Sequence, residues 1–148
     1  MVTKTQILHC VLCVTAMFAP SCESTQRTAS QKQEFKAIYV NQFKLTYFRQ
    51  FLAKSYNNSN AVQEIINDDH SGFTEPILTA DDYQLIDSLT MIDNEYLKVD
   101  STEGDRRAEG AQGKRPLGFI MQKLTGKWLD SLAKQRLKLS GVPDSWTD

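Results

Sequence analysis

The strongest constraint on this chain is a ladder of five aromatic residues at steps of four: Phe35, Tyr39, Phe43, Tyr47 and Phe51. Residues four apart are neighbours on a helix surface, and each such step turns the helix by about 400°. The ladder therefore drifts by about 40° per step and covers nearly half of the helix. A helix that is apolar over so much of its girth is typical of a central helix with at least two neighbours. We therefore predict an all-α fold, a small bundle of four to five helices around this aromatic-rich first helix, Phe35 to Tyr56, with its rings buried.

Two more helices are expected after a break at residues 57–60. A short amphipathic one begins at Asn60, a fair N-cap, and ends before Gly72. The next follows Thr79, a second candidate cap, with Asp81 and Asp82 in the first turn, where the helix dipole favours negative charge. It ends near Lys98, and its apolar stripe is Tyr83, Ile86, Leu89, Ile92 and Tyr96.

The last helical region starts at Pro116, which suits a first helical position. Thr125 and Gly126 predict a break, with Thr125 as the new cap, and Gly141 and Pro143 predict the stop. The apolar face is expected to hold Leu117, Ile120, Met121 and Leu124 before the break and Trp128, Leu129, Leu132 and Leu137 after it. Trp146 is expected to fold back on the bundle, and no strand or internal repeat is evident.

The first 21 residues read as a signal peptide. Lys4 precedes an apolar stretch over residues 7–18, which is too short to span a bilayer. Small residues then lead to Cys22, as in the lipobox of bacterial lipoproteins, although the usual aliphatic residue is replaced by Ala19. We expect lipidation at Cys22, a polar tether over residues 22–33 and a helical domain over residues 34–148. An ordinary signal peptide cut near Ala19 or Ser21 is the alternative.

The cysteines and charges agree with export of a single domain. Cys10 and Cys13 would leave with the leader, so the mature chain keeps Cys22 alone, without an intrachain disulfide partner. Lipidation or an intermolecular disulfide would account for that thiol. Residues 22–148 carry 16 basic and 18 acidic side chains, which gives no reason to expect nucleic acid as a partner. The expected location is the bacterial envelope, as a periplasmic or outer-membrane-anchored lipoprotein.

The sequence offers no recognisable catalytic motif. His70 is the one histidine of the mature chain. His70 and its neighbours Asp68 and Asp69 cannot all point at one metal ion from a regular helix. A serine triad, a reactive thiol or a phosphate loop would need partners or spacings that are missing here. We predict no catalytic residue, no metal and no cofactor, and hence no enzyme. An enzyme of unrecognised type stays open if His70 meets carboxylates from other helices.

Residues 100–114 form the most hydrophilic stretch, with three glycines and no apolar period, and predict an exposed loop. It is longer than a bundle of this size needs. It is either a solvated insertion or a recognition loop on a rigid helical base. For the second reading, the candidate partner-binding residues are Glu103, Asp105, Arg106, Arg107 and Glu109.

Two segments of the chain carry short motifs, one in the first helix and one in the last. Segment 45–56 has a leucine–alanine pair, Leu52 and Ala53, before an aromatic, Tyr56. Segment 120–133 has a break before a leucine–aspartate pair, Leu129 and Asp130. These motifs resemble those of the type VI secretion amidase immunity proteins; where that family tends to carry a cysteine in each of these helices, this chain has Phe51 and Ile120. The resemblance implies a periplasmic all-helical inhibitor, often a homodimer, that plugs a peptidoglycan amidase toxin with a protruding loop.

The alternative of another class is a lipoprotein that scaffolds or regulates an envelope complex. Such a protein would bind a resident partner rather than a delivered toxin. The genes beside this one would separate the two readings, since an amidase or secretion gene favours immunity.

Overall fold

In the computed structural model, residues 22–102 and 113–141 are described. Within these ranges the chain forms helices and no strand, as expected for an all-α bundle. The helices are α2 (Cys22–Ser55), α3 (Asn60–Asp68), α4 (Ala80–Thr102), α5 (Pro116–Thr125) and α6 (Lys127–Leu139).

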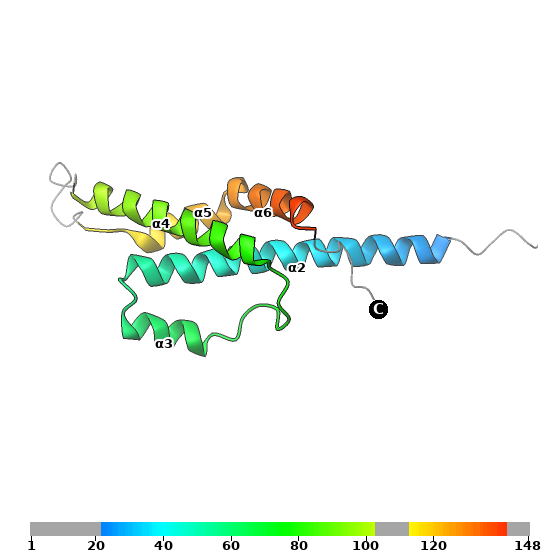
Figure 1. Ribbon diagram of the computed structural model, residues 1–148, viewed down its shortest axis with the longest axis horizontal. Coiled ribbons are helices and arrows are strands. Elements are labelled where there is room, and N and C mark those ends of the chain that lie inside the picture. The colour runs from blue at the N-terminus through cyan, green and yellow to red at the C-terminus, as the bar shows by residue number, and fades with distance from the viewer. Residues whose placement is uncertain (1–21, 103–112, 142–148) are drawn as a thin grey trace, which may run out of the picture.

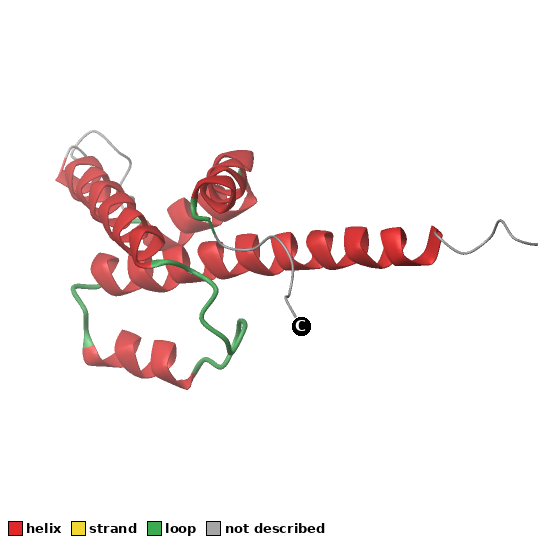
Figure 2. Ribbon diagram, turned by 45° about the vertical axis from the view of Figure 1, so that its right-hand side comes forward, coloured by secondary structure: helices red, strands yellow, loops and turns green. Residues whose placement is uncertain are grey.

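Helix α2 is the axis of the bundle, and every other helix packs on it. Figure 1 shows α3 returning beneath the second half of α2, so that α4 runs in the same direction as α2, whereas α5 and α6 run back the opposite way. Figures 1 and 2 both show α4 diverging from α2 toward its C-terminal end. The side chain of Phe119 on α5 fills the space between the diverging helices. Its ring centre lies 5.3 Å from that of Phe51 on α2 and 6.0 Å from that of Tyr96 on α4.

The aromatic ladder is buried as predicted. Phe35 is 3% exposed, and the other four rings are fully enclosed. Two pairs of consecutive rings stack along α2, with 6.5 Å between the ring centres of Tyr39 and Phe43 and 6.2 Å between those of Tyr47 and Phe51. The ladder is thus the core of the bundle, completed from the other helices by residues such as Ile86, Leu97, Ile120, Leu129 and Ala133.

The stretch expected as a polar tether, residues 22–33, is the first part of α2. No glycine or proline interrupts this stretch, so nothing in its sequence stops the helix of the packed segment from continuing through it. Its described side chains, from Thr28 onward, are all exposed. The expected flexible tether is therefore helical in the structure, whereas its role as a spacer stays a prediction.

Helix α4 buries a different face from the one its apolar stripe predicted. Of that stripe Ile86 is buried, but Tyr83, Ile92 and Tyr96 are 42%, 62% and 60% exposed. The buried face is instead largely polar and includes Asp82, Thr90, Asp93 and Asn94. The prediction assumed that apolar residues turn inward; here hydroxyl groups on α2 require acceptors, and α4 supplies them.

The end of α4 and the two last helices also differ in detail. Helix α4 continues to Thr102, so the loop expected from Asp100 starts later, because no helix breaker occurs before Gly104. The break between α5 and α6 is confirmed, but its cap is Gly126, without a side-chain hydrogen bond, rather than Thr125. Leu117, Met121 and Trp128 were expected on the buried face and are 57%, 61% and 50% exposed.

Helix α3 is held by the residues that follow it, since it has no buried residue of its own. Its N-cap is Ser59 rather than Asn60. Arg49 on α2 donates to the Asp69 carboxylate at 2.9 Å and to the carbonyl of Ser71 at 2.8 Å. The hydrogen bonds from Ser71 and then from Arg49 lower the pKa of Asp69 to about 2. These contacts fasten the end of α3 to α2.

Gly72 lets the α3–α4 connector lie directly on α2. Its φ is +106°, in the region that favours glycine, and an added Cβ would lie 2.7 Å from both the Gln42 Oε1 and a methyl carbon of Leu45. Glycine is thus required for both conformation and space.

Candidate functional site

The first polar site of the bundle is centred on Asp82, which is fully buried at the start of α4. Its carboxylate accepts hydrogen bonds from the Tyr39 hydroxyl (2.8 Å), the Thr79 backbone N–H (3.0 Å) and the Thr79 hydroxyl (2.9 Å). The guanidinium Nε of Arg136 on α6 donates to its other oxygen at 2.9 Å. The Thr79 hydroxyl also accepts from the Asp82 N–H at 3.2 Å, so Thr79 caps α4 as predicted.

The charge state of this site follows from its contacts. Burial opposes the ionised form of Asp82, but hydrogen bonds from Thr79, Tyr39 and Arg136 outweigh it and hold its pKa below the ordinary value. Burial, together with the bond to Asp82, raises the pKa of Tyr39 well above its ordinary value. Asp82 is therefore an anion that joins α2, α4 and α6, and Tyr39 is a neutral donor to it.

The second polar site repeats this chemistry two turns further along α2. The Tyr47 hydroxyl donates to Asp93 on α4, and Lys123 on α5 donates to the other Asp93 oxygen at 2.9 Å. Burial, followed by the bond to Asp93, raises the pKa of Tyr47. The Lys123 ammonium also lies 5.1 Å from the ring centre of Phe119 and 4.8 Å from that of Trp128. Lys123 thus connects a buried carboxylate to two aromatic rings nearer the surface.

An apolar surface covers the second site. Tyr96 contacts Phe119, and Lys123 contacts Phe119 and Trp128, so side chains from α4, α5 and α6 form one strip. Ile92 and Val99 share the face of α4 that carries Tyr96, because they lie four and three residues from it. We call this the α4–α5 surface; it consists of Ile92, Tyr96, Val99, Phe119, Lys123 and Trp128.

The composition of this surface suits contact with another protein. Ile92, Tyr96, Val99 and Trp128 are each at least half exposed. A contiguous exposed apolar strip with a cation at its centre is uncommon on a monomer, and aromatic residues are enriched where proteins bind one another. A shallow groove of about 200 Å³, lined by Gln122, Lys123, Gly126 and Trp128, marks one edge of the strip.

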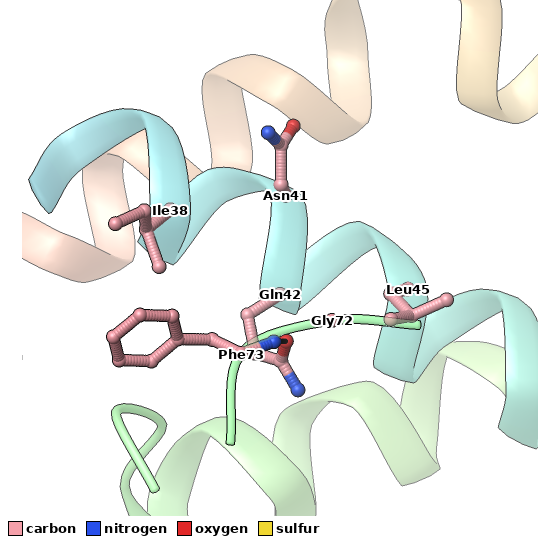
Figure 3. Close-up of a pocket in the computed structure, with 6 residues that line it drawn as sticks. All are labelled: Ile38, Asn41, Gln42, Leu45, Gly72 and Phe73. Carbon is pink, nitrogen blue, oxygen red and sulfur yellow. Dashed lines mark hydrogen bonds between the residues drawn. The ribbon is translucent and has the colours of Figure 1, made fainter. Parts of the chain in front are cut away.

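A larger groove of about 370 Å³ lies between α2 and the connector that follows α3. In Figure 3, Phe73 lies beneath Ile38 while Asn41 points away from Phe73. The Gln42 Oε1 accepts from the Phe73 N–H at 3.0 Å and holds the connector at this distance. None of the lining residues is titratable, so the groove offers shape but no acid–base chemistry. They are Ile38, Asn41, Gln42, Leu45, Gly72 and Phe73.

The five residues predicted to bind a partner, Glu103, Asp105, Arg106, Arg107 and Glu109, lie outside the described residues, as do the leader and Trp146. Both flanks of their segment are described. Figures 1 and 2 show that α4 ends and α5 begins at the same end of the bundle, near the end of α2. Val99 and Leu117, 55% and 57% exposed, lie close to these two flanks in sequence.

The remaining candidates lie apart from this surface. Cys22 is the first residue of α2, at the opposite end of that helix from the α4–α5 surface. His70 is exposed just beyond α3 and lines neither groove. Across residues 22–102 and 113–141, no cluster of histidine, cysteine and acidic side chains could hold a metal ion. No helix in those ranges is both long and apolar enough to span a bilayer.

The sequence reading missed the two buried acids and the role of Lys123. It noted Asp82 only as a negative charge in the first turn of its helix, and it did not single out Asp93. The available signal was the pair of tyrosines in the ladder, because a buried hydroxyl needs a partner. Tyr96 and Trp128 were assigned to buried faces by helical spacing alone, which does not reveal that their faces remain uncovered.

Comparisons with protein-family models, with curated proteins and with solved structures gave no match to this chain. The leucine–aspartate pair and the two positions noted in the resemblance have clear structural roles nevertheless. Leu129, Phe51 and Ile120 are buried, and Asp130 forms an ion pair with Lys134 one turn later on α6.

Proposed function

We propose that this chain is an envelope-anchored protein that binds another protein through the α4–α5 surface and the charged segment, residues 103–112, that joins α4 to α5. The observation that carries the proposal is the exposed aromatic strip from Tyr96 to Trp128, which the Lys123–Asp93 ion pair ties to α4. A preorganised surface loses little conformational entropy on binding, which favours affinity. The signal-peptide pattern and Cys22 support anchoring in the envelope.

In its finer form, we propose that the partner is a peptidoglycan amidase toxin and that the chain acts as an immunity protein. The resemblance of segments 45–56 and 120–133 to amidase immunity proteins supports this form. In it, Arg106 and Arg107 anchor the contact, because arginine is enriched at binding hot spots. Glu103, Asp105 and Glu109 supply complementary charges, and the α4–α5 surface forms the adjoining apolar contact.

The experiment measures binding of the chain to a panel of peptidoglycan amidase effectors, including any that is encoded beside its gene. Nanomolar binding and protection of cells that receive the amidase in the periplasm are expected for one member. The double variant Arg106→Ala/Arg107→Ala should weaken that binding by about 2–4 kcal/mol without unfolding the bundle. Tyr96→Ala/Trp128→Ala should have a similar effect.

A matched control is Tyr83→Ala, which removes the same kind of side chain from the other end of α4, where it is 42% exposed. This variant should bind like the unmodified chain. If Tyr83→Ala weakens binding as much as Tyr96→Ala, the α4–α5 surface is not the contact.

The second candidate function is that of a scaffold or regulator of an envelope complex, which the same exposed surface would also serve. If no amidase binds and crosslinking in intact cells captures a resident envelope protein at Tyr96, the scaffold is correct and the immunity function is wrong.

A further inference from the structure

Charge is strongly segregated along this chain although its net charge is close to zero. Residues 60–102 carry ten acidic side chains and one lysine. Residues 22–55 carry six basic and two acidic side chains, and residues 113–141 carry seven basic and one acidic side chain. Helices α2, α5 and α6 are therefore the basic part of the bundle, and α3 and α4 are the acidic part.

Folding brings part of these charges together. Among the residues that the structure describes, the ion pairs between the acidic part and the basic part include four that lie where α2, α5 or α6 meets α4 or the end of α3: Arg49–Asp69, Lys54–Asp87, Lys123–Asp93 and Arg136–Asp82. The acidic part thus meets α2, α5 and α6 along these contacts. Asp82 reaches α2 and α6 from the α4 side of their contact, and none of the four pairs involves a lysine on the other side of that contact.

That side carries four lysines, which we call the lysine face: Lys36 and Lys44 on α2, and Lys134 and Lys138 on α6. Helix α6 packs on α2 through Leu129, Ala133 and Leu137, which are buried. Lys134 and Lys138 lie four residues apart, on one side of α6. Lys36 and Lys44 lie eight apart, which is about 80° past two full turns, so both lie within a quarter of the circumference of α2. Lys36, Lys134 and Lys138 are exposed, and Lys44 is half-buried.

Asp130 on α6 lies on this face, because it pairs with Lys134 one turn later. Its carboxylate pairs with Lys134, and that hydrogen bond, the charge of Lys134 and the charges of Lys44 and Lys36 lower its pKa. Lysines from both α2 and α6 therefore lie close enough to act on one carboxylate. Four ammonium groups against this single carboxylate leave the face with a net positive charge.

We propose that the lysine face lies on anionic phospholipid headgroups while the acyl chain at Cys22 holds the protein at the membrane. Clustered lysines are attracted to anionic bilayer surfaces, and one lipid chain together with a basic patch binds more firmly than either alone. A membrane fits better than an acidic protein because Cys22 begins the same helix. Fourteen residues of α2 separate Cys22 from Lys36, about 21 Å along the helix.

This placement also orients the partner-binding surface. Phe51, which stacks on Phe119 beneath the α4–α5 surface, lies 29 residues after Cys22, about 44 Å along α2. In both Figures 1 and 2, α3 lies on the opposite side of α2 from α6. With the lysine face on the bilayer, α3 faces away from it, and the α4–α5 surface projects at the far end. The inference rests on the membrane location in the proposed function.

The test uses the chain from Cys22 onward, which contains every described helix and the buried core, with Cys22→Ser so that no acyl chain contributes. The chain should co-sediment with vesicles of phosphatidylglycerol and phosphatidylcholine, and it should not co-sediment with vesicles of phosphatidylcholine alone. Lys36→Gln/Lys138→Gln should lower the partition coefficient at least tenfold. Asp130→Asn should raise it severalfold, because it removes the one carboxylate of the face.

The matched control removes two positive charges elsewhere, Lys98→Gln/Lys114→Gln, and should leave the partition coefficient within twofold. Equal losses in the two double variants would show that net charge alone drives binding and would overturn the proposal. Equal sedimentation with both kinds of vesicle would also overturn it. Lipidation of Cys22 is measured separately, by the mass of the protein purified from membranes, so failure of one idea leaves the other intact.

Discussion

Helices α2 and α4 pack on each other with faces of different chemistry. The buried face of α2 is a stack of aromatic rings, whereas that of α4 includes two carboxylates, a threonine and an asparagine. The two faces fit because Tyr39 and Tyr47 extend hydroxyl groups from the stack to Asp82 and Asp93. One helix supplies apolar area and the other supplies hydrogen-bond acceptors at two fixed points.

The difference shows how a helix can be positioned by few contacts. Apolar packing is non-directional and tolerates sliding, whereas a hydrogen bond to a buried carboxylate works at one register only. Arg136 and Lys123 extend the two networks to α6 and α5, so the same acids also fix the last helices. We infer that α2 supplies most of the stability and that α4 supplies most of the register.

Removing a ladder ring should have the largest effect on stability. Phe43→Ala leaves a cavity in the centre of the stack and should lower the free energy of unfolding by about 3–5 kcal/mol, measured by urea denaturation. Ile92→Ala on α4 removes an exposed apolar side chain and should change it by less than about 0.5 kcal/mol. Similar losses in both variants would mean that α4 is packed by its apolar stripe after all.

Removing a buried acceptor should come next. Asp82→Ala leaves Arg136 and Tyr39 without their partner and should cost about 2–4 kcal/mol, toward the lower values because Arg136 is 21% exposed and can reach water. Asp81→Ala, the exposed neighbour in the same turn, should cost less than about 1 kcal/mol. If Asp82→Ala costs as little as Asp81→Ala, the Asp82 site does not fix the register of α4 on α2.

Acid should destabilise the bundle through the buried carboxylate of Asp82 on α4 and not through the aromatic ladder of α2. Because the pKa of Asp82 is lower in the folded chain than in the unfolded chain, its contribution is complete above the unfolded value of about 3.9. That contribution is lost as the pH falls from there through the folded pKa. The melting temperature should therefore drop below about pH 4, and it should drop less in Asp82→Asn than in Asp81→Asn. The same drop in both would point to other carboxylates.

The smallest effect should come from the tyrosine hydroxyls. Tyr39→Phe and Tyr47→Phe keep the stacked rings and remove one hydrogen bond each, while Asp82 and Asp93 keep their basic partners. Each should lower the free energy of unfolding by about 1 kcal/mol. Tyr83→Phe, whose ring is partly in solvent, is the control and should be neutral. Neutral Tyr39→Phe and Tyr47→Phe would show that the hydroxyl bonds contribute nothing beyond ring packing.

Apart from the start of α2, which lies at Cys22 and not near Phe35, the helices could be read from the sequence to within a few residues, because caps, breakers and apolar periods act locally. Thr79, Pro116, Gly126 and Gly141 all lie at or beside the ends they predict. The exposure of the α4–α5 surface could not be read in this way. Tyr96 and Trp128 have the spacing of core residues, and their exposure depends on where α4 diverges from α2 and on what covers α5 and α6.

By itself the sequence determined that the first helix is the core, because a five-ring ladder has no stable place in water. Only the tertiary structure decided which face of α4 turns inward. That choice balances exposed apolar side chains against two buried tyrosine hydroxyls that need acceptors, and the acceptors lie 43 and 46 residues away in the chain. Local spacing carries no record of such distant pairings, so Asp82 and Asp93 resembled ordinary surface acids until the helices were packed together.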